Sequence, residues 1–445
     1  MNKTTLKKTN PQSAIEKSAI RNPQSAIRNM RRSPLLIIFI TIFIDLIGFG
    51  IVIPVLPLYA EGTQFNATPF QIGLLLASYS IMQLIFAPIL GGLSDKYGRK
   101  PILFFSLIGT SIGFVVTGLA NTLLILFAGR ILDGITGGNL STAQAYIADV
   151  TKPEDRAKGM GLVGAAFGLG FIFGPLIGGV LSRWGVAVPF LFAAGLSFVN
   201  AIGLLFFLPE TVTKDHPARN TAGEGVLSRM SNALKNPTLA MLLFINFLLI
   251  TAFSVMTTVF ALFTQYRFGY DALYNGYLFA FIGILAVIMQ GGLIGRLAKM
   301  FGEITLLIAG ALILAVSLLT LPFVGPKMFG LIGLLVNLFF ISIGNSLTTP
   351  SISSLASKSV SAREQGVALG ATQSSGSLAR AVGPIIGGWL LYHFAMPQKI
   401  SDYSVVVTFW ASSAVIFIAA IITVYFSRTQ ATSYAKEAVP ADSNL

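Results

Sequence analysis

The chain has 445 residues, of which 54% are hydrophobic and only 11% charged, and its mean hydropathy is +0.77. A soluble protein carries about a quarter charged residues, so this composition excludes a solvated globular fold and indicates a membrane protein. There is no cysteine, and the two histidines, His216 and His393, lie far apart in the sequence, so we expect no disulfide, no thiolate chemistry and no metal site. We interpret the net charge of +13 as cytoplasmic loops that face anionic lipid, and expect no nucleic-acid partner.

The first 34 residues are polar and basic, and the hexapeptide Asn-Pro-Gln-Ser-Ala-Ile occurs at both 10–15 and 22–27. This segment lacks the apolar core and the cleavage site of a signal peptide. We therefore predict that 1–34 is a cytoplasmic low-complexity tail, with translation starting at either Met1 or Met30.

Twelve later stretches are long and apolar enough to span a bilayer, for which a helix needs about 20 residues. The sequence therefore predicts an all-α membrane protein with twelve transmembrane helices. They lie at 35–59, 70–94, 101–119, 121–149, 159–182, 188–208, 237–264, 274–298, 304–322, 329–357, 366–392 and 405–427.

The positive charges predict the orientation, because Lys and Arg near span ends are retained on the cytoplasmic side. With the N-terminus inside, 24 of the 30 Lys and Arg residues fall in cytoplasmic segments and four in outer loops. The remaining two, Arg130 and Arg380, lie within spans. We therefore predict that both termini are cytoplasmic and that the chain is a multi-pass protein of the cell inner membrane.

Four charged residues lie near the midplane of their spans: Asp45 in span 1, Arg130 and Asp133 in span 4, and Arg380 in span 11. A charge at that depth costs from about 2.5 kcal/mol upward, so these side chains should face water or one another. Burial favours the neutral form of a carboxyl group and a nearby arginine favours the charged form. We therefore hypothesise that these four residues couple proton movement, with Asp45 as the titrating acid, Arg130 modulating it and Asp133 second.

Simpler interpretations of these acids stay open at this point. Asp45 could form a permanent ion pair or bind a cationic substrate without titrating. Asp133 is three residues from Arg130 on one helix, so the two can form a static local pair.

The loop after span 2 reads Gly91-Gly92-Leu93-Ser94-Asp95-Lys96-Tyr97-Gly98-Arg99-Lys100. It resembles the signature loop of the major facilitator superfamily, G-x-x-x-D-[RK]-x-G-R-[RK], at every defined position. Spans 1, 4 and 5 are similar to the twelve-span drug:proton antiporters, including the tetracycline-efflux branch. The resemblance implies the major facilitator fold and a cytoplasmic gate. The gate residues it implies are Gly91, Asp95, Lys96, Gly98, Arg99, Lys100 and Asp149; the alternative is a positive-inside anchor with helix-end charges.

Span 5 is rich in glycine and contains Pro175. Glycines four residues apart allow two helices to approach closely, and a proline permits a bend. The resemblance to antiporters implies a tightly packed hinge against the other half, and simple packing is the alternative. The hinge residues are Gly164, Gly168, Gly170, Gly174, Pro175, Gly178 and Gly179.

The polar stretch 209–236 separates six spans from six. The two sides repeat one plan, since the sequence at 174–179, Gly-Pro-Leu-Ile-Gly-Gly, returns as Gly-Pro-Ile-Ile-Gly-Gly at 383–388. We predict two pseudo-symmetric six-helix bundles, 35–208 and 237–427, a cytoplasmic linker at 209–236 and a cytoplasmic tail at 428–445. The second copy of the signature loop has Lys299 in place of the acid, so we expect an asymmetric gate carried mainly by the first half.

Paired halves around a midplane site are typical of carriers that work by alternating access. The resemblance implies export of a drug-like small molecule, with tetracycline as one candidate, in exchange for protons. We expect a monomer in the lipid bilayer, no cofactor and no enzymatic activity, because no phosphate-binding loop is present. The alternatives are a proton-coupled symporter or facilitator for a metabolite, and a membrane receptor that transports nothing.

Overall fold

The computed structural model describes residues 34–151, 156–212, 235–361, 364–395 and 400–437. Within these ranges the chain is helical, and the only β-type pairing is a pair of isolated bridges from Gly325. The predicted all-α fold is therefore confirmed. Most of the predicted tail 1–34 and linker 209–236, and the end of the tail 428–445, lie outside the described residues.

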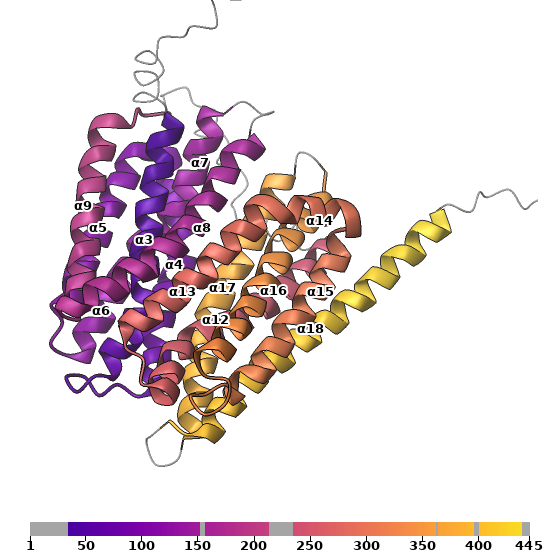
Figure 1. The fold of residues 1–445 in the computed structure, drawn as a ribbon. Helices are drawn as coiled ribbons and strands as arrows, with labels where there is room; N and C mark the ends of the chain where they lie inside the picture. Colours follow the sequence, from indigo (N-terminus) through magenta and orange to yellow (C-terminus); the bar gives the residue numbers. More distant parts are fainter. Residues whose placement is uncertain (1–33, 152–155, 213–234, 362–363, 396–399, 438–445) are drawn as a thin grey trace, which may run out of the picture.

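Twelve helical rods follow one another in the described chain (Figure 1). Two rods are interrupted, the fourth by the 3₁₀ turn η1 (Gly137–Asn139) and the eighth by the π-helical turn η4 (Met289–Leu293). The rods are α3 (Pro34–Glu61), α4 (Pro69–Tyr97), α5 (Arg99–Gly118), α6 (Leu123–Thr136) with α7 (Leu140–Val150), α8 (Arg156–Leu181), α9 (Val188–Phe207), α12 (Pro237–Phe268), α13 (Ala272–Ile288) with α14 (Ile294–Phe301), α15 (Glu303–Thr320), α16 (Gly330–Lys358), α17 (Gln365–His393) and α18 (Asp402–Glu437).

Local capping chemistry fixes several helix starts. At the start of α4, the Gln71 N–H donates to Thr68 Oγ1 over 3.3 Å and the Thr68 N–H donates to Gln71 Oε1 over 2.9 Å. Asn236 accepts hydrogen bonds from the first backbone N–H groups of α12. These side chains satisfy donors that a helix leaves unpaired at its first turn.

Eleven of the described helices are long and apolar enough to cross a membrane by length and composition. The twelfth rod, α17, is long enough at 29 residues but is rich in Gly and Ser. It packs along α4 and α12, so protein rather than lipid covers much of its surface. The twelve predicted spans are all present as helices, and the last, α18, continues past residue 427 to Glu437.

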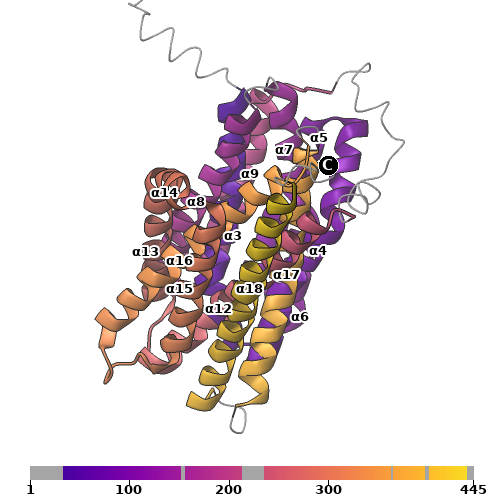
Figure 2. The same cartoon turned by 90° about the vertical axis from the view of Figure 1, so that its right-hand side faces the viewer.

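Helices α3–α9 pack mainly among themselves, and so do α12–α18. Figures 1 and 2 show the two groups side by side, with α18 on the side of the second group that faces away from the first. The groups meet where α4 packs on α17 and α8 packs on α13.

We call the end of the molecule that holds Pro34, Gly98 and Thr151 the inner end, and the opposite end the outer end. At the outer end the two groups touch backbone to backbone. A Cβ added at Gly73 of α4 would lie 2.2 Å from the Pro384 carbonyl oxygen of α17. A Cβ added at Gly276 of α13 would lie 2.6 Å from the Pro175 carbonyl oxygen of α8. Only glycine fits such crossings, so the outer end is closed.

Toward the inner end the groups separate. A Cβ added at Gly164 of α8, Gly292 of η4 or Gly370 of α17 would meet no heavy atom within 4 Å. The structure is therefore closed at the outer end and open toward the inner end.

Candidate functional site

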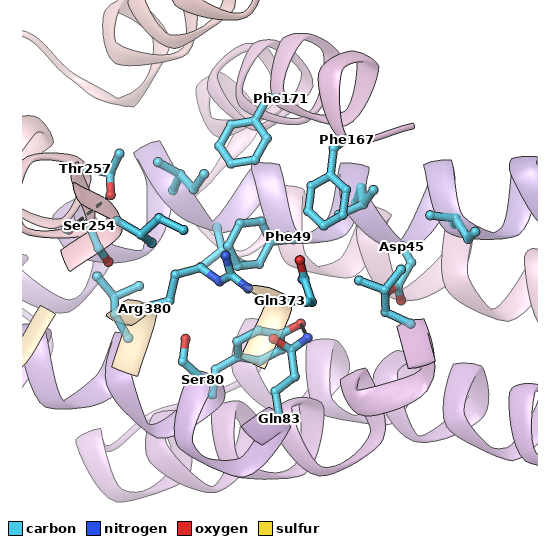
Figure 3. Close-up of a pocket in the computed structure, with 18 of the residues that line it drawn as sticks. Asp45, Phe49, Ser80, Gln83, Phe167, Phe171, Ser254, Thr257, Gln373 and Arg380 are labelled. Carbon is cyan, nitrogen blue, oxygen red and sulfur yellow. Dashed lines mark hydrogen bonds between the residues drawn. The ribbon is translucent and has the colours of Figure 1, made fainter. Parts of the chain in front are cut away.

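A cavity of about 260 Å³ lies between the two groups of helices, and both groups line it. Aromatic side chains form much of its wall: the rings of Phe49 and Phe171 lie 6.0 Å apart, and those of Phe49 and Tyr79 lie 5.8 Å apart. Three of the four predicted midplane charges line this cavity, namely Asp45, Arg130 and Arg380. Figure 3 shows Asp45 and Arg380 among the polar side chains that project into it.

Arg130 and Asp133 form an ion pair on α6, with 2.5 Å between Arg130 Nη1 and Asp133 Oδ2. Both residues are buried, at 2% and 3% exposure. The Arg130 guanidinium also lies 4.5 Å from the centre of the Tyr79 ring. This confirms the predicted local pair, which neutralises the arginine and one of the two midplane acids.

Asp45 projects from α3 into the cavity and interacts with two groups from the fourth rod. Asn139 and Asp133 are the two polar side chains of that rod that influence its carboxyl group. Asp45 is the only acid among the described residues that line the cavity. The positive charge of Arg130 is already engaged by Asp133, so any influence of Arg130 on Asp45 acts through that pair.

The η1 turn brings Asn139 to this position. A Cβ at Gly137 would lie 2.8 Å from the Tyr79 hydroxyl, and a Cβ at Gly138 would lie 2.8 Å from the Ala87 nitrogen. Gln83 Nε2 donates to the Gly137 carbonyl over 2.9 Å, which satisfies a backbone acceptor at the interrupted turn. The sequence predicted one span at 121–149 without this turn, because the turn depends on contact with α4.

Arg380 of α17 differs from Arg130 because no carboxylate within the described residues lies within ion-pair distance of it. Its Nη2 donates to Ser377 Oγ, one turn earlier on the same helix, over 3.1 Å. In Figure 3 the guanidinium points into the cavity near Phe49 and Gln373. The four residues grouped from sequence thus divide into an ion pair, an acid beside that pair and a separate arginine.

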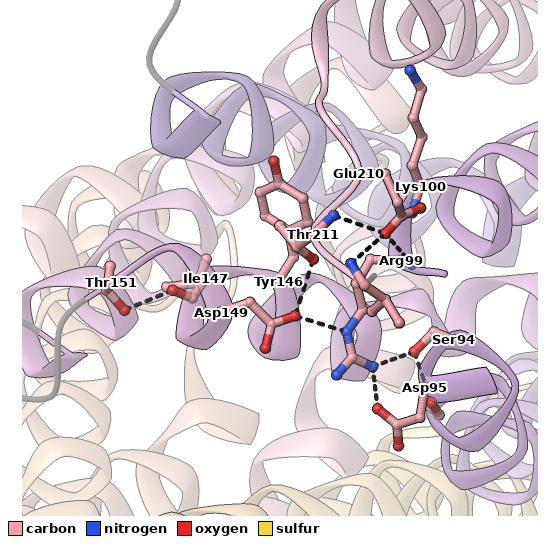
Figure 4. A network of polar contacts seen from close by, with 12 residues as sticks. Ser94, Asp95, Arg99, Lys100, Tyr146, Ile147, Asp149, Thr151, Glu210 and Thr211 are labelled. Atoms are coloured by element: carbon pink, nitrogen blue, oxygen red, sulfur yellow. Dashed lines mark hydrogen bonds and ion pairs between the residues drawn. The ribbon is translucent and has the colours of Figure 1, made fainter. Parts of the chain in front are cut away.

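Arg99 is the centre of a polar network at the inner end (Figure 4). It is 4% exposed, and its guanidinium lies 2.6 Å from Asp95 Oδ1 and 3.1 Å from Asp149 Oδ2. It also donates to Ser94 Oγ over 2.6 Å, and Thr211 Oγ1 donates to Asp149. We call Ser94, Asp95, Arg99, Asp149, Glu210 and Thr211 the inner-end network. Its residues come from the first half and from the start of the segment that follows it, 209–212, and it is intact although the molecule is open at this end.

Glu210 is the member of this network that the sequence did not single out. Its carboxylate accepts the backbone N–H groups of Arg99 over 2.9 Å and Lys100 over 3.0 Å, and so caps α5. Gly98 has φ +109°, and a Cβ there would lie 2.5 Å from Glu210 Oε2. The prediction of 209–236 as a linker gave Glu210 no role; the available signal was an acid three residues after the end of α9.

The remaining predicted gate residues contribute less to these contacts. The Lys96 ammonium lies 5.2 Å from the ring of its neighbour Tyr97, and Lys100 joins the network through its backbone alone. A Cβ at Gly91 would lie 3.6 Å from Ser141 Oγ. Asp95, Arg99 and Asp149 are thus the gate residues that the structure brings together.

The second half has an ion pair at the matching place, with the charges reversed. Glu303 is the first residue of α15, as Arg99 is the first of α5, and each follows a glycine with positive φ. Glu303 pairs with Lys358 at the end of α16 and accepts a hydrogen bond from Ser354 over 3.0 Å. Lys299, in place of the acid of the signature loop, predicted that the two halves differ. At this position they differ in the sign of the charge on the residue that begins the helix, positive at Arg99 and negative at Glu303.

The predicted hinge residues of α8 face three environments. A Cβ at Gly170, Gly174 or Gly178 would approach α3 of the same half. Gly179 approaches Ala272 of α13, and Gly168 approaches Val287 of α13, both in the other half. Gly164 faces open space, and Pro175 contributes its carbonyl oxygen to the crossing with Gly276. Only part of this glycine series therefore contacts the other half.

The family model of the Major Facilitator Superfamily matches residues 38–384 and 292–443. The class H tetracycline resistance protein of Pasteurella multocida is 33% identical over 413 residues, which cover 92% of this chain and 100% of that protein. Multidrug resistance protein 2 of Bacillus subtilis is 29% identical over 370 residues, which cover 81% of this chain and 90% of that protein.

Two solved structures share the fold. A human organic anion transporter aligns with a TM-score of 0.64 at 24% identity and covers 88% of this chain and 99% of its own. A bacterial homologue of the human lysosomal transporter Spinster, in an inward-facing and unoccupied conformation, aligns with a TM-score of 0.71 at 17% identity and covers 90% of this chain and 97% of its own. These likenesses confirm the predicted fold class.

Proposed function

Because the chain belongs to the Major Facilitator Superfamily, we propose that it exports a drug-like small molecule in exchange for protons. It is a membrane transporter of small molecules and not an enzyme. Relatives similar along most of the chain are tetracycline and multidrug resistance proteins. Tetracyclines are therefore the first substrates to test.

The proton-exchange proposal rests on one observation, the position of Asp45 in the cavity wall. It is the only acid among the described cavity-lining residues, and both midplane arginines line the same cavity. Around it lie Asn139 and Asp133, with Arg130 held by Asp133. A carboxyl group in this place binds either a proton or a cationic group of the substrate, but not both at once. Exchange of substrate for protons requires that the two compete in this way.

The working cycle follows from the two ends of the molecule. With the inner end open, Asp45 releases its proton to the inner side and substrate enters the cavity. Once the halves rock and the outer end opens, a proton from outside displaces the substrate. Each proton moved across 100 mV supplies about 2.3 kcal/mol.

The inner-end network has a separate role in this proposal. It ties the starts and ends of the first-half helices together, while the partly exposed Asp95 remains available to the other half when the inner end closes. We assign the inner end to the cytoplasm because the positive charges gather there. Both termini in the cytoplasm, an inner-membrane location, a monomer, and two bundles divided at 209–236 belong to the same proposal.

Reconstitution in liposomes with an imposed pH gradient tests this function. We expect tetracycline to move against the proton, and Asp45→Asn to abolish proton-driven movement while substrate-substrate exchange persists. Glu61→Gln, at the outer end of the same helix, is the matched control and should transport normally. Normal proton exchange by Asp45→Asn would refute the assignment, substrate movement with the proton would establish symport, and no movement of tetracyclines, lipophilic cations or sugars would favour a receptor.

A further inference from the structure

Arg380 is a cation at the centre of the protein whose charge no side chain of the described residues neutralises. Its hydrogen bond to Ser377 reaches a neutral hydroxyl, whereas Arg130, in the same cavity, has an ion pair to Asp133. A charge within a membrane protein costs free energy unless it is paired or solvated. A guanidinium that faces a cavity and has no ion-pair partner can bind an anionic group of a ligand.

Asp45 lies on another side of the cavity. Figure 3 shows the two side chains well separated, with Phe49 and Gln373 between them in that view. Asp45 interacts with Asn139 and Asp133, and no ion pair joins it to Arg380. The cavity therefore has a negative and a positive side chain at separate places in its wall. The rings of Phe49 and Phe171, whose centres are 6.0 Å apart, form an aromatic part of the same wall.

We propose that Arg380 is the residue of this cavity that binds the acidic group of an aromatic substrate. The acidic group of the ligand, a carboxylate or an enolate, binds the Arg380 guanidinium through charge-assisted hydrogen bonds. The cationic group faces Asp45, and the aromatic body packs on Phe49 and Phe171. This inference rests on the proposed function and names a residue that determines the specificity of the same site.

Charge balance separates zwitterions from simple anions. A simple anion on Arg380 would be repelled by ionised Asp45 and would bind best when Asp45 is protonated, so anion and proton would travel together. A zwitterion matches ionised Asp45 and Arg380 at once, and protonation of Asp45 weakens its hold on the cationic end. Only the second case has the proton and the substrate displacing each other.

Equilibrium binding to the purified protein in lipid nanodiscs, without any gradient, tests the proposal with matched probes. Norfloxacin carries a carboxylate and a piperazinium, its methyl ester lacks the carboxylate, and its N-acetyl derivative lacks the cation. We expect the wild type to bind norfloxacin more tightly than either derivative. Arg380→Gln should weaken norfloxacin binding about 10- to 100-fold, the effect of one lost charge-assisted hydrogen bond, and change ester binding less than about threefold.

Two further variants complete the design. Arg380→Lys keeps the charge but not the planar fork, so its affinity for norfloxacin should fall between those of the wild type and Arg380→Gln. Arg183→Gln removes a cation from the exposed outer turn after α8 and should bind all three probes as the wild type does.

The proposal is overturned if the wild type does not prefer norfloxacin to its ester, a result that needs no variant to fold. Equal losses of acid and ester binding in Arg380→Gln would overturn it as well, because they indicate a structural role. If the protein prefers the acid to the ester through Arg380 but shows no proton-driven export, the result supports this inference and contradicts only the proposed function.

Discussion

Gly73→Ala should shift the protein away from the inward-open arrangement. The added methyl group would lie 2.2 Å from the Pro384 carbonyl oxygen, whereas ordinary contacts begin at 3.4 Å. The clash exceeds 1 Å and involves backbone atoms of α17, so no side-chain rotation relieves it. Overpacking of this kind costs about 1–3 kcal/mol, and the clash exists only while the outer end is closed. We therefore expect the ratio of inward-open to outward-open molecules to fall about 5- to 150-fold.

A single cysteine can report this change because the chain contains none. Thr349 lines the cavity, so Thr349→Cys should react with a membrane-impermeant maleimide added from the inner end. We expect Gly73→Ala to slow this labelling at least about fivefold. Gly388→Ala, where the methyl group would lie 2.4 Å from the Pro69 carbonyl oxygen, should act in the same way. The control is Gly203→Ala in α9, where a Cβ meets nothing within 4 Å. Equal labelling of Gly73→Ala and Gly203→Ala, with both proteins folded, would refute the reasoning.

Two further outcomes are expected for thermal stability in detergent. Asp133→Asn should lower the stability by about 3–5 kcal/mol because it leaves the buried Arg130 charge without its partner. Replacing both members by apolar residues should cost less, and a double variant no more stable than Asp133→Asn would contradict this. Gly98→Ala should destabilise more than Gly302→Ala. Both positions have positive φ, but only at Gly98 does the new Cβ meet another residue, Glu210 at 2.5 Å. Equal melting temperatures of the two alanine variants would show that the contact with Glu210 is unimportant.

Hydropathy predicted the twelve spans because a bilayer requires about 20 apolar residues wherever a helix crosses it, a condition that each segment meets locally. The segment 366–392 was predicted in the same way, although α17 is not among the eleven described helices that are apolar enough along their length to cross a membrane. The turns at 137–139 and 289–293 were not predicted, and the first of them depends on contact with α4, whose Gln83 donates to the Gly137 carbonyl. The Gly91-Gly92-Leu93 segment is regular helix in α4, whereas the same three residue types at 291–293, Gly-Gly-Leu, lie in a π-helical turn.

The sequence placed the midplane charges in one group, and the structure separates them. The Arg130–Asp133 pair was predictable from spacing on one helix. The isolation of Arg380 was not, because it depends on which residues of α3, α4 and α6 face α17. The capping role of Glu210 was also hidden, since a residue in a polar linker gives no periodic signal.

The contacts within and between the halves differ in kind, and this difference determines how the molecule can move. Within each half, charged side chains tie the inner helix ends together: Arg99 to Asp149 in the first half and Glu303 to Lys358 in the second. Between the halves, the outer contacts at Gly73 and Gly276 are bare backbone crossings. Such crossings contain no side chain to repack and no charge to desolvate, so separating them costs little beyond lost dispersion contacts. Each half can therefore rock as a rigid unit. A single methyl group at a crossing is then enough to bias the equilibrium, whereas changes to the ion pairs should affect the stability of one half before they affect the movement of both.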